Sequence, residues 1–490
     1  MNYIVLVIIF LGAIYTTSRY GPARTFSLIV LPTMLYLATT MAYKIANIPA
    51  FDPVSCIAYG TLIGMALGRR VPKLTIHPID YLIAVMTLTP AISGWLNVEF
   101  WTFINMGSDR IFWWFVPYML GRMALSDPVE RARALKVLCI ATPIIGFLAL
   151  LEWRLLPNEV SRFTNRISLT NVNNEMVLKR FAFFRSMVFY HHPIDHGNMG
   201  VMTGAMIVIL AYMSGKSIWS RTVMIGLGGS LVCIFTSMSF TSYLAAAVAV
   251  GLVYFFFKLP SQRWVLPLFV LFMVGGMLYL TNDLLSKQLN DEQRINASAL
   301  QDSLWIRALI VQRAWEFAQQ AGFFGFEREV SKDQLALESV DNSYMLFIIR
   351  FGWIYLAGWV ILLASFTVIA YRMFKTTVFA PTSVRLPVIT ATCALLGVMC
   401  GMYTVWFGFT YSYFFMIILG MFITLRQMTR TAFARSAYSP MPGSAARGFG
   451  VRQTPRVRPK TEPQPEPKAV PQAVPQTVPQ TGRVDAIGQN

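Results

Sequence analysis

The chain is dominated by apolar runs of about 20 residues, the length that an α-helix needs to cross the hydrocarbon core of a bilayer. These runs recur between residues 3 and 426, and short polar segments separate most of them. A backbone in lipid must satisfy its own hydrogen bonds, so such runs fold as helices; a closed barrel would show alternating strands of about 10 residues. The sequence therefore predicts an all-α protein, a polytopic membrane helix bundle.

We expect twelve or thirteen transmembrane helices, the number depending on whether the first apolar run is a span. The candidate spans are residues 3–18, 25–43, 51–68, 79–97, 111–125, 134–152, 198–214, 219–236, 242–258, 263–281, 343–371, 384–405 and 410–426. Short loops on one side carry sixteen Lys or Arg, and those on the other carry only Lys44 and Arg110. Basic loops stay in the cytoplasm, so the C-terminus is expected inside. This bias explains much of the net charge of +18, and no nucleic-acid partner is expected.

Two long polar loops, about 153–197 and 282–342, interrupt the predicted membrane domain of residues 1–427. Both fall on the side opposite the basic loops, which is the periplasmic side. Residues 428–490 are basic and then rich in Pro and Gln, and we expect a disordered cytoplasmic tail that is either solvated or a docking segment. All five cysteines lie in apolar spans, where they are expected to pack as small apolar residues.

The first loop carries an excess of cations, which predicts either a solvated surface or an anion-binding one. Arg180 and Arg185 are the favoured binding residues, because they lie among aromatic residues in RFAFFRSMVFY just before the next span. The planar guanidinium fork suits phosphate oxygens, and an interfacial segment would hold it at the depth of lipid headgroups.

Three of the four histidines of the chain, His191, His192 and His196, lie within six residues, together with Asp195. A metal site, a base or hydrogen-bonding role, and a helix-capping role are all open for this cluster. A metal is the least favoured, because neither a HExxH pattern nor a second carboxylate cluster accompanies it. His192, which directly precedes a proline, is the preferred polar group.

The second loop contains Arg307 in an amphipathic segment, where it either snorkels to the membrane surface or binds a phosphate or sugar oxygen. The GFFGFE stretch that follows predicts only a turn. Asp341 and Asn342 stand at the start of a span, where capping of the helix is the default role. Arg350, eight residues into that span, must face a partner or a wet cavity.

In this order, these residues resemble the O-antigen ligase and Wzy-type polysaccharide polymerase superfamily, in particular polymerases of exopolysaccharide systems. The resemblance covers roughly residues 100–425. The matching residues are Arg185, His192-Pro193-Ile194, Gly197, Arg307, Trp315, the GFFGF turn, Asp341-Asn342-Ser343-Tyr344 and Gly352.

The resemblance implies a C-type membrane glycosyltransferase of the bacterial inner membrane that needs neither metal nor cofactor. It would transfer polyprenyl-diphosphate-linked oligosaccharide repeat units onto a growing glycan on the outer face, in exopolysaccharide or O-antigen biosynthesis. By this likeness Arg185 and Arg307 hold the diphosphate and His192 positions or deprotonates the acceptor hydroxyl. The substrate-binding residues would be Arg180, Asp341, Asn342, Tyr344 and Arg350. Membrane lipids, a chain-length regulator and export proteins are the further partners to expect.

Two departures from the family favour a polymerase over a ligase. The turn SMSFTSY, Ser237 to Tyr243, lacks the arginine of the Ser-Arg-Gly turn that ligases often show. The histidine of ligases in the second loop is also absent, and Asp341 precedes the asparagine instead. The alternatives that stay open are a lipid-linked oligosaccharide flippase and an O-antigen ligase-type transferase to a lipid or protein acceptor.

Overall fold

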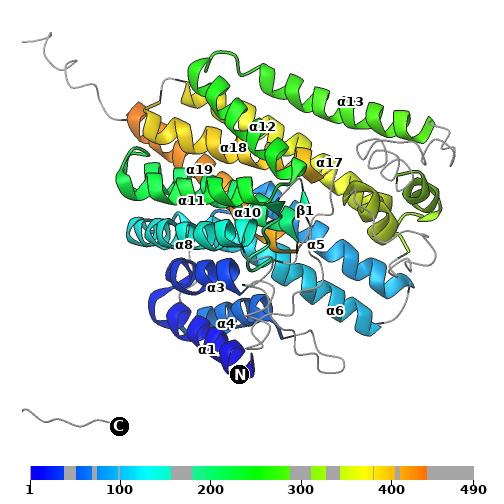
Figure 1. Ribbon diagram of the computed structural model, residues 1–490, viewed down its shortest axis with the longest axis horizontal. Helices are drawn as coiled ribbons and strands as arrows, with labels where there is room; N and C mark the ends of the chain where they lie inside the picture. The colour runs from blue at the N-terminus through cyan, green and yellow to red at the C-terminus, as the bar shows by residue number, and fades with distance from the viewer. Residues whose placement is uncertain are drawn as a thin grey trace, which may run out of the picture. The chain divides into compact units, whose positions relative to one another are not determined.

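The fold of the protein is an all-α bundle, as predicted (Figure 1). The computed structural model describes residues 2–37, 51–68, 74–97, 100–155, 160, 179–180, 183–190, 192–286, 311–326, 343–378, 380–402 and 409–438. Within these ranges nine helices are long and apolar enough to cross a membrane. The other four predicted spans fold as shorter or broken helices, so the twelve or thirteen full-length spans expected are not all seen in the described part of the chain.

The nine membrane-length helices are joined by shorter ones. The long helices are α1 (Asn2–Tyr20), α5 (Pro78–Asn97), α8 (Pro128–Arg154), α10 (Pro193–Met213), α12 (Phe240–Lys258), α13 (Val265–Ser286), α17 (Ser343–Thr377), α18 (Thr382–Met402) and α19 (Phe409–Tyr438). The others are α2 (Pro22–Thr25), the π-helix η1 (Phe26–Val30), α3 (Leu31–Tyr36), α4 (Pro53–Gly68), α6 (Phe100–Arg110), the π-helix η2 (Ile111–Phe115), α7 (Val116–Ala124) and α11 (Arg221–Thr236).

Four of these helices begin in the same way, with a polar residue followed by proline at the first helical position. The polar residues are Asp52, His77, Asp127 and His192, and each side chain accepts a hydrogen bond from a backbone N–H of the first turn. The first N–H groups of a helix have no partner within it, and proline removes one of them while fixing a helical φ. The sequence therefore determines where α4, α5, α8 and α10 start.

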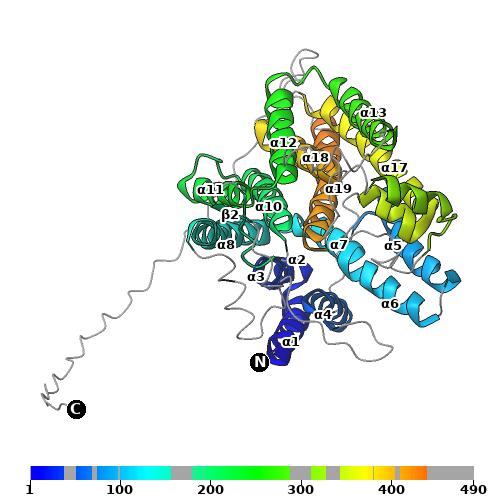
Figure 2. The ribbon, with the colours of Figure 1, turned by 45° about the vertical axis from the view of Figure 1, so that its right-hand side comes forward.

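The central helices pack in a continuous apolar core. α10 contacts α8, α11, α12 and α18, and α12 lies along α18. α13 packs against α17, which also contacts α5, and Figure 2 shows α13 alongside α17. α6, η2 and α7 form one helical stretch from Phe100 to Ala124, so Arg110, expected in a short outer loop, lies inside a helical stretch instead.

At one end of the bundle, a buried ion pair ties three helices together. Arg122 of α7 is fully buried; its guanidinium pairs with Asp80 of α5 and donates to the side chain of Gln427 of α19 at 3.2 Å. α7 and α19 approach closely there, because a Cβ on Gly420 would lie 2.1 Å from the carbonyl oxygen of Tyr118. α19 itself continues to Tyr438, past residue 427, where the membrane domain was expected to end.

The chain divides into two compact units, Met1–Ser436 and Ala437–Asn490. The structure describes the second unit only at its first two residues, which end α19. The predicted Pro/Gln-rich part of the tail lies outside the described residues.

Candidate functional site

The end of the first loop is a short hairpin followed by an irregular segment, residues 185–190, that leads into α10. β1 (Lys179–Arg180) pairs antiparallel with β2 (Phe183–Phe184). The ring of Phe183 stacks on Trp153, near the end of α8, at 4.3 Å between centroids. Arg180, one of the predicted binding residues, lies in β1. The aromatic stacking thus fixes the hairpin to α8 immediately before Arg185.

Glu152 of α8 holds the segment after the hairpin. One carboxylate oxygen, Oε2, accepts from Ser186 Oγ at 3.1 Å and from the backbone N–H groups of Met187 at 3.0 Å and Val188 at 2.8 Å. Glu152 is almost fully buried. Val188 has a φ of 48°, a left-handed conformation that is strained for a β-branched residue. A buried carboxylate with three donors offsets such strain, so this turn is built around Glu152.

Arg185 is anchored on the turn between α11 and α12. Its Nε donates to the carbonyl oxygen of Ser237 at 3.2 Å, and the neighbouring Ser186 N–H donates to Thr236 O at 3.0 Å. Gly197 of α10 packs against the same turn, since a Cβ there would lie 2.5 Å from Ser237 Oγ and 2.4 Å from Ser242 Oγ. The residues 237–243, which depart from the ligase pattern, therefore form the surface that carries Arg185.

His192 is the N-cap of α10. It has extended backbone angles, and its Nδ1 accepts from the N–H of Ile194 at 3.2 Å. Burial, and then the charge of Arg185, lower the pKa of His192 to about 4. The imidazole is therefore neutral at pH 7, and because Nδ1 accepts, the proton is on Nε2. His192 caps the helix and, in this tautomer, presents an N–H donor at Nε2.

Four contacts fix the first loop: the stacking of Phe183 on Trp153, and the hydrogen bonds of Glu152, Arg185 and His192. They lie at one end of the bundle, which we call the loop end. It consists of the last turns of α8 and α11 and the first turns of α10 and α12. The helices that flank the second loop reach the same end. Tyr344, at the start of α17, donates to Met399 O of α18 at 3.1 Å. Gly401 of α18 packs on Thr241 of α12, and the adjacent Ser242 donates to Ile194 O at 3.3 Å.

The GFFGF turn docks on a break in α17. Gly352 has a φ of 82° and interrupts the helix two residues after Arg350. Phe326 N–H donates to Ile349 O at 2.8 Å, and Ile354 N–H donates to Phe323 O at 3.3 Å. The structure thus brings the turn, residues 322–326, onto the segment of α17 that contains Arg350 and Gly352. Arg307, Asp341 and Asn342 lie outside the described residues.

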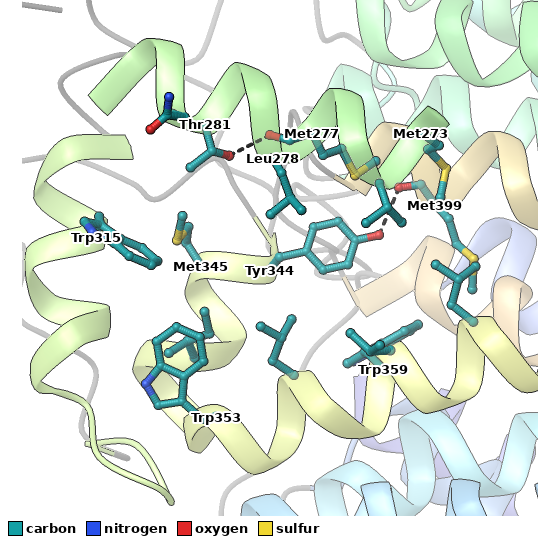
Figure 3. Close-up of a pocket in the computed structure, with 16 residues that line it drawn as sticks. Met273, Met277, Leu278, Thr281, Trp315, Tyr344, Met345, Trp353, Trp359 and Met399 are labelled. Atoms are coloured by element: carbon teal, nitrogen blue, oxygen red, sulfur yellow. Dashed lines mark hydrogen bonds between the residues drawn. The ribbon is translucent and has the colours of Figure 1, made fainter. Parts of the chain in front are cut away.

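An apolar cavity of about 350 Å³, which we call the α17 cavity, is lined by residues of α13 and α17, the helices that flank the second loop. Figure 3 shows Tyr344 crossing it toward Met399, with Trp315 and Trp353 at the other end. The rings of these two tryptophans meet edge to face at 6.1 Å. The lining side chains come from α13, α17, α18 and the helix at 311–320, and Thr281, Asn282 and Tyr344 are its polar members.

A second apolar cavity, of about 380 Å³, lies beneath the first loop among α10, α11, α12 and α18; we call it the α10 cavity. Gly200, one turn below Gly197, lines it, and so does Ile234, whose carbonyl oxygen accepts from Ser237 Oγ at 2.7 Å. Ser237 is also the residue that holds Arg185. Each long loop therefore has an apolar cavity below its anchoring residues.

The sequence alone did not point to Glu152, although a glutamate near the end of an apolar run was a usable signal. A second missed signal is the repeated tetrapeptide His-Pro-Ile-Asp, at 77–80 and 192–195. Among the described residues, no group of three or more His, Cys, Asp or Glu side chains could hold a metal ion.

Comparison of the chain with protein-family models, curated proteins and solved structures finds no match.

Proposed function

We propose that this chain is an inner-membrane glycosyltransferase that moves polyprenyl-diphosphate-linked oligosaccharide units onto a growing glycan on the periplasmic side. The observation that carries the proposal is the placement of Arg185 and His192 at the loop end, on the side of the α10 cavity where Gly200 and Ile234 line it. A cation and an N–H donor over an apolar cavity match an amphiphile with an anionic headgroup and a hydrocarbon tail.

The chemistry of the transfer fits this arrangement. When the glycosidic bond to the diphosphate breaks, negative charge builds on the leaving group, and a guanidinium placed in advance stabilises it. Arg185 is placed in this way, because Ser237 O holds its Nε at 3.2 Å. His192 Nε2–H is suited to donate to a phosphate or sugar oxygen. Arg307, Asp341 and Asn342 would complete the site from the second loop.

The presence of two apolar cavities supports a transferase whose donor and acceptor are both lipid-linked. A polymerase has a lipid-linked donor and a lipid-linked acceptor, and both tails need a place in the membrane beside one polar site. The α10 and α17 cavities have similar volumes, about 380 and 350 Å³, and α18 contributes to the lining of both. We assign one tail to each cavity.

The test is polymer formation by the purified full-length protein in detergent, supplied with labelled lipid-linked repeat units. We expect the wild-type protein to lengthen the glycan and Arg185→Ala to lower the rate at least about 100-fold, the typical loss when a charge-stabilising donor is removed. Arg221→Ala, an exposed arginine at the opposite end of α11, should behave as wild type. Lengthening at the wild-type rate by Arg185→Ala would refute the role of Arg185, and no transfer by wild-type protein would refute the proposal.

A lipid-linked sugar flippase is the second candidate, and one observation favours it. Asp109 and Arg110 lie inside the helical stretch 100–124, and Arg110 stacks over Phe351 of α17 at 5.1 Å. Charged side chains inside the membrane often line a pathway. A flippase moves labelled lipid-linked sugar across a proteoliposome membrane and makes no polymer in detergent, so the two assays separate the candidates.

A further inference from the structure

The His-Pro-Ile-Asp tetrapeptide occurs twice, and the two copies use their aspartates differently. One copy begins α5 and the other begins α10, and in each the histidine Nδ1 accepts from the isoleucine N–H at 3.2 Å. The histidine, proline and isoleucine therefore form the same helix N-cap in both places. A difference between the aspartates must come from something other than the start of a helix.

The aspartate of the first copy is fully engaged in structure. Asp80 Oδ2 accepts from the N–H of His77 at 2.7 Å, which completes the cap, and Oδ1 accepts from the hydroxyl of Tyr118 and pairs with Arg122. These partners link α5 to α7. Asp80 is thus an acid that the fold requires.

The aspartate of the second copy has no such partners. Asp195 makes no hydrogen bond and no ion pair with the residues that the structure describes, and its side chain is only partly buried. It lies in the first turn of α10, three residues after His192 and at the same loop end as Arg185. The fold therefore leaves this carboxylate without a structural partner among the described residues.

The surroundings of Asp195 are polar and incompletely paired. The adjacent His196 is fully buried, and its Nδ1 has no hydrogen-bond partner among the described residues; the same holds for Asn198 Oδ1 and Glu152 Oε1. Buried polar atoms nearly always have partners, and each one without a partner calls for water or a polar ligand. The first turns of α10 thus have the character of a binding site rather than of a helix packed in lipid.

A transfer to a hydroxyl requires a group that takes the hydroxyl proton, and His192 is not that group in this structure. Its Nδ1 lone pair is engaged by Ile194 N–H, and the neutral ring carries its proton on Nε2. Glu152 is almost fully buried and its Oε2 accepts three hydrogen bonds, so it does not reach the acceptor. Asp195 is the remaining carboxylate among the described residues at the loop end of α10.

We propose that Asp195 is the general base of the transfer, an inference that rests on the proposed function. The acceptor oxygen forms a bond to the anomeric carbon while the bond from that carbon to the diphosphate oxygen breaks. Polyprenyl diphosphate leaves with the electron pair, next to Arg185. The hydroxyl proton passes to a carboxylate oxygen of Asp195, which releases it to water afterwards.

Several other titratable groups lie on α10 and on the elements packed against its first turns, and they set the pH at which Asp195 acts. They are His192 and His196 of α10, Glu152 of α8, Arg185 and Tyr190 of the preceding segment, Cys233 of α11, Tyr243 of α12 and Cys400 of α18. A pH profile therefore has to be measured with the full chain, in which all these groups are present.

The experiment compares wild type, Asp195→Asn, Asp195→Glu and Asp80→Asn as purified full-length proteins, with initial polymerisation rates measured from pH 5 to pH 9. Asparagine fits the same position but cannot take the proton. We expect Asp195→Asn to lower the rate about 100- to 10,000-fold and to abolish the fall in rate on the acidic side. Asp195→Glu should restore part of the rate. Polyprenyl diphosphate alone should bind Asp195→Asn as tightly as it binds wild type, which a merely structural role would not predict.

Asp80→Asn is the matched control, because it alters the same motif where the aspartate is structural. It should lower the melting temperature while keeping the acidic limb of the profile. A rate of Asp195→Asn within threefold of wild type, or a parallel loss of polyprenyl diphosphate binding, would overturn the role of Asp195 and leave the proposed function intact. Absence of transfer by wild type at every pH would remove both.

Discussion

The turn built around Glu152 gives a prediction about how the first loop is held. Glu152→Ala removes the acceptor shared by Ser186 Oγ and the backbone N–H groups of Met187 and Val188. All three donor residues are buried, so water does not replace the carboxylate without rearrangement. The change should release residues 186–190 from α8 and leave the helix itself intact.

The magnitude follows from the two backbone N–H groups that lose their partner. A buried donor left unsatisfied costs about 1–3 kcal/mol, so the docked turn should lose about 2–6 kcal/mol relative to the open one. The left-handed Val188 adds to the drive for opening, because this backbone conformation is strained for a β-branched residue. An opening of this size should speed amide exchange at 187 and 188 by about 30-fold or more, since about 1.4 kcal/mol is tenfold.

Hydrogen exchange read by mass spectrometry on the purified protein measures this directly. Glu130→Ala is the matched control, because Glu130 is a second buried glutamate of α8 that accepts from Ser27 Oγ at 2.8 Å near the other end of the helix. It should leave exchange at 187 and 188 unchanged. Unchanged exchange of these amides in Glu152→Ala would refute the argument that the carboxylate holds the turn.

Three further predictions follow from the geometry. Burial lowers the pKa of His192 from its usual 6.5 to about 4, so between these pH values the unfolded chain binds a proton that the folded one does not. The contribution of His192 to thermal stability should therefore be full above pH 6.5 and decrease toward pH 4. His192→Asn should make this decrease smaller. Gly420→Ala places a Cβ 2.1 Å from a carbonyl oxygen of α7 and should reduce the amount of folded protein in membranes, whereas Gly228→Ala, with nothing within 4 Å, should not. Gly352→Ala meets a positive φ and a carbonyl oxygen at 2.0 Å, so limited proteolysis should cut the 322–326 turn faster than in wild type.

Much of the architecture could be predicted from the sequence because the membrane enforces it. Apolar runs fold as helices in lipid, and polar-Pro pairs such as Asp127-Pro128 mark helix starts. The break at Gly352 and the helical continuation through Arg110 could not be predicted in this way. They depend on which segments pack against them, and periodicity along one helix carries no such information.

The candidate site could be predicted only in part. Arg185 and His192 stood out because they are polar residues next to aromatic ones at the end of a loop. The capping bond to His192 Nδ1, which decides whether the ring donates or accepts, is a property of geometry that no spacing reveals. Asp195 was considered only as a member of the histidine cluster, and Glu152 was not singled out, because a single acid near a span is more often structural than functional.

The contacts that position Arg185, His192 and Glu152 have a property in common: most of their partners are backbone atoms. Ser237 O, the N–H of Ile194 and the N–H groups of Met187 and Val188 would be available whatever side chains stood at those positions. Natural selection therefore needs to retain only a few residues, out of more than four hundred, to keep this arrangement. Proteins built on the same plan could diverge until alignment loses them, and a search by the relative placement of an arginine, a capping histidine and a buried glutamate would find them where a search by sequence does not.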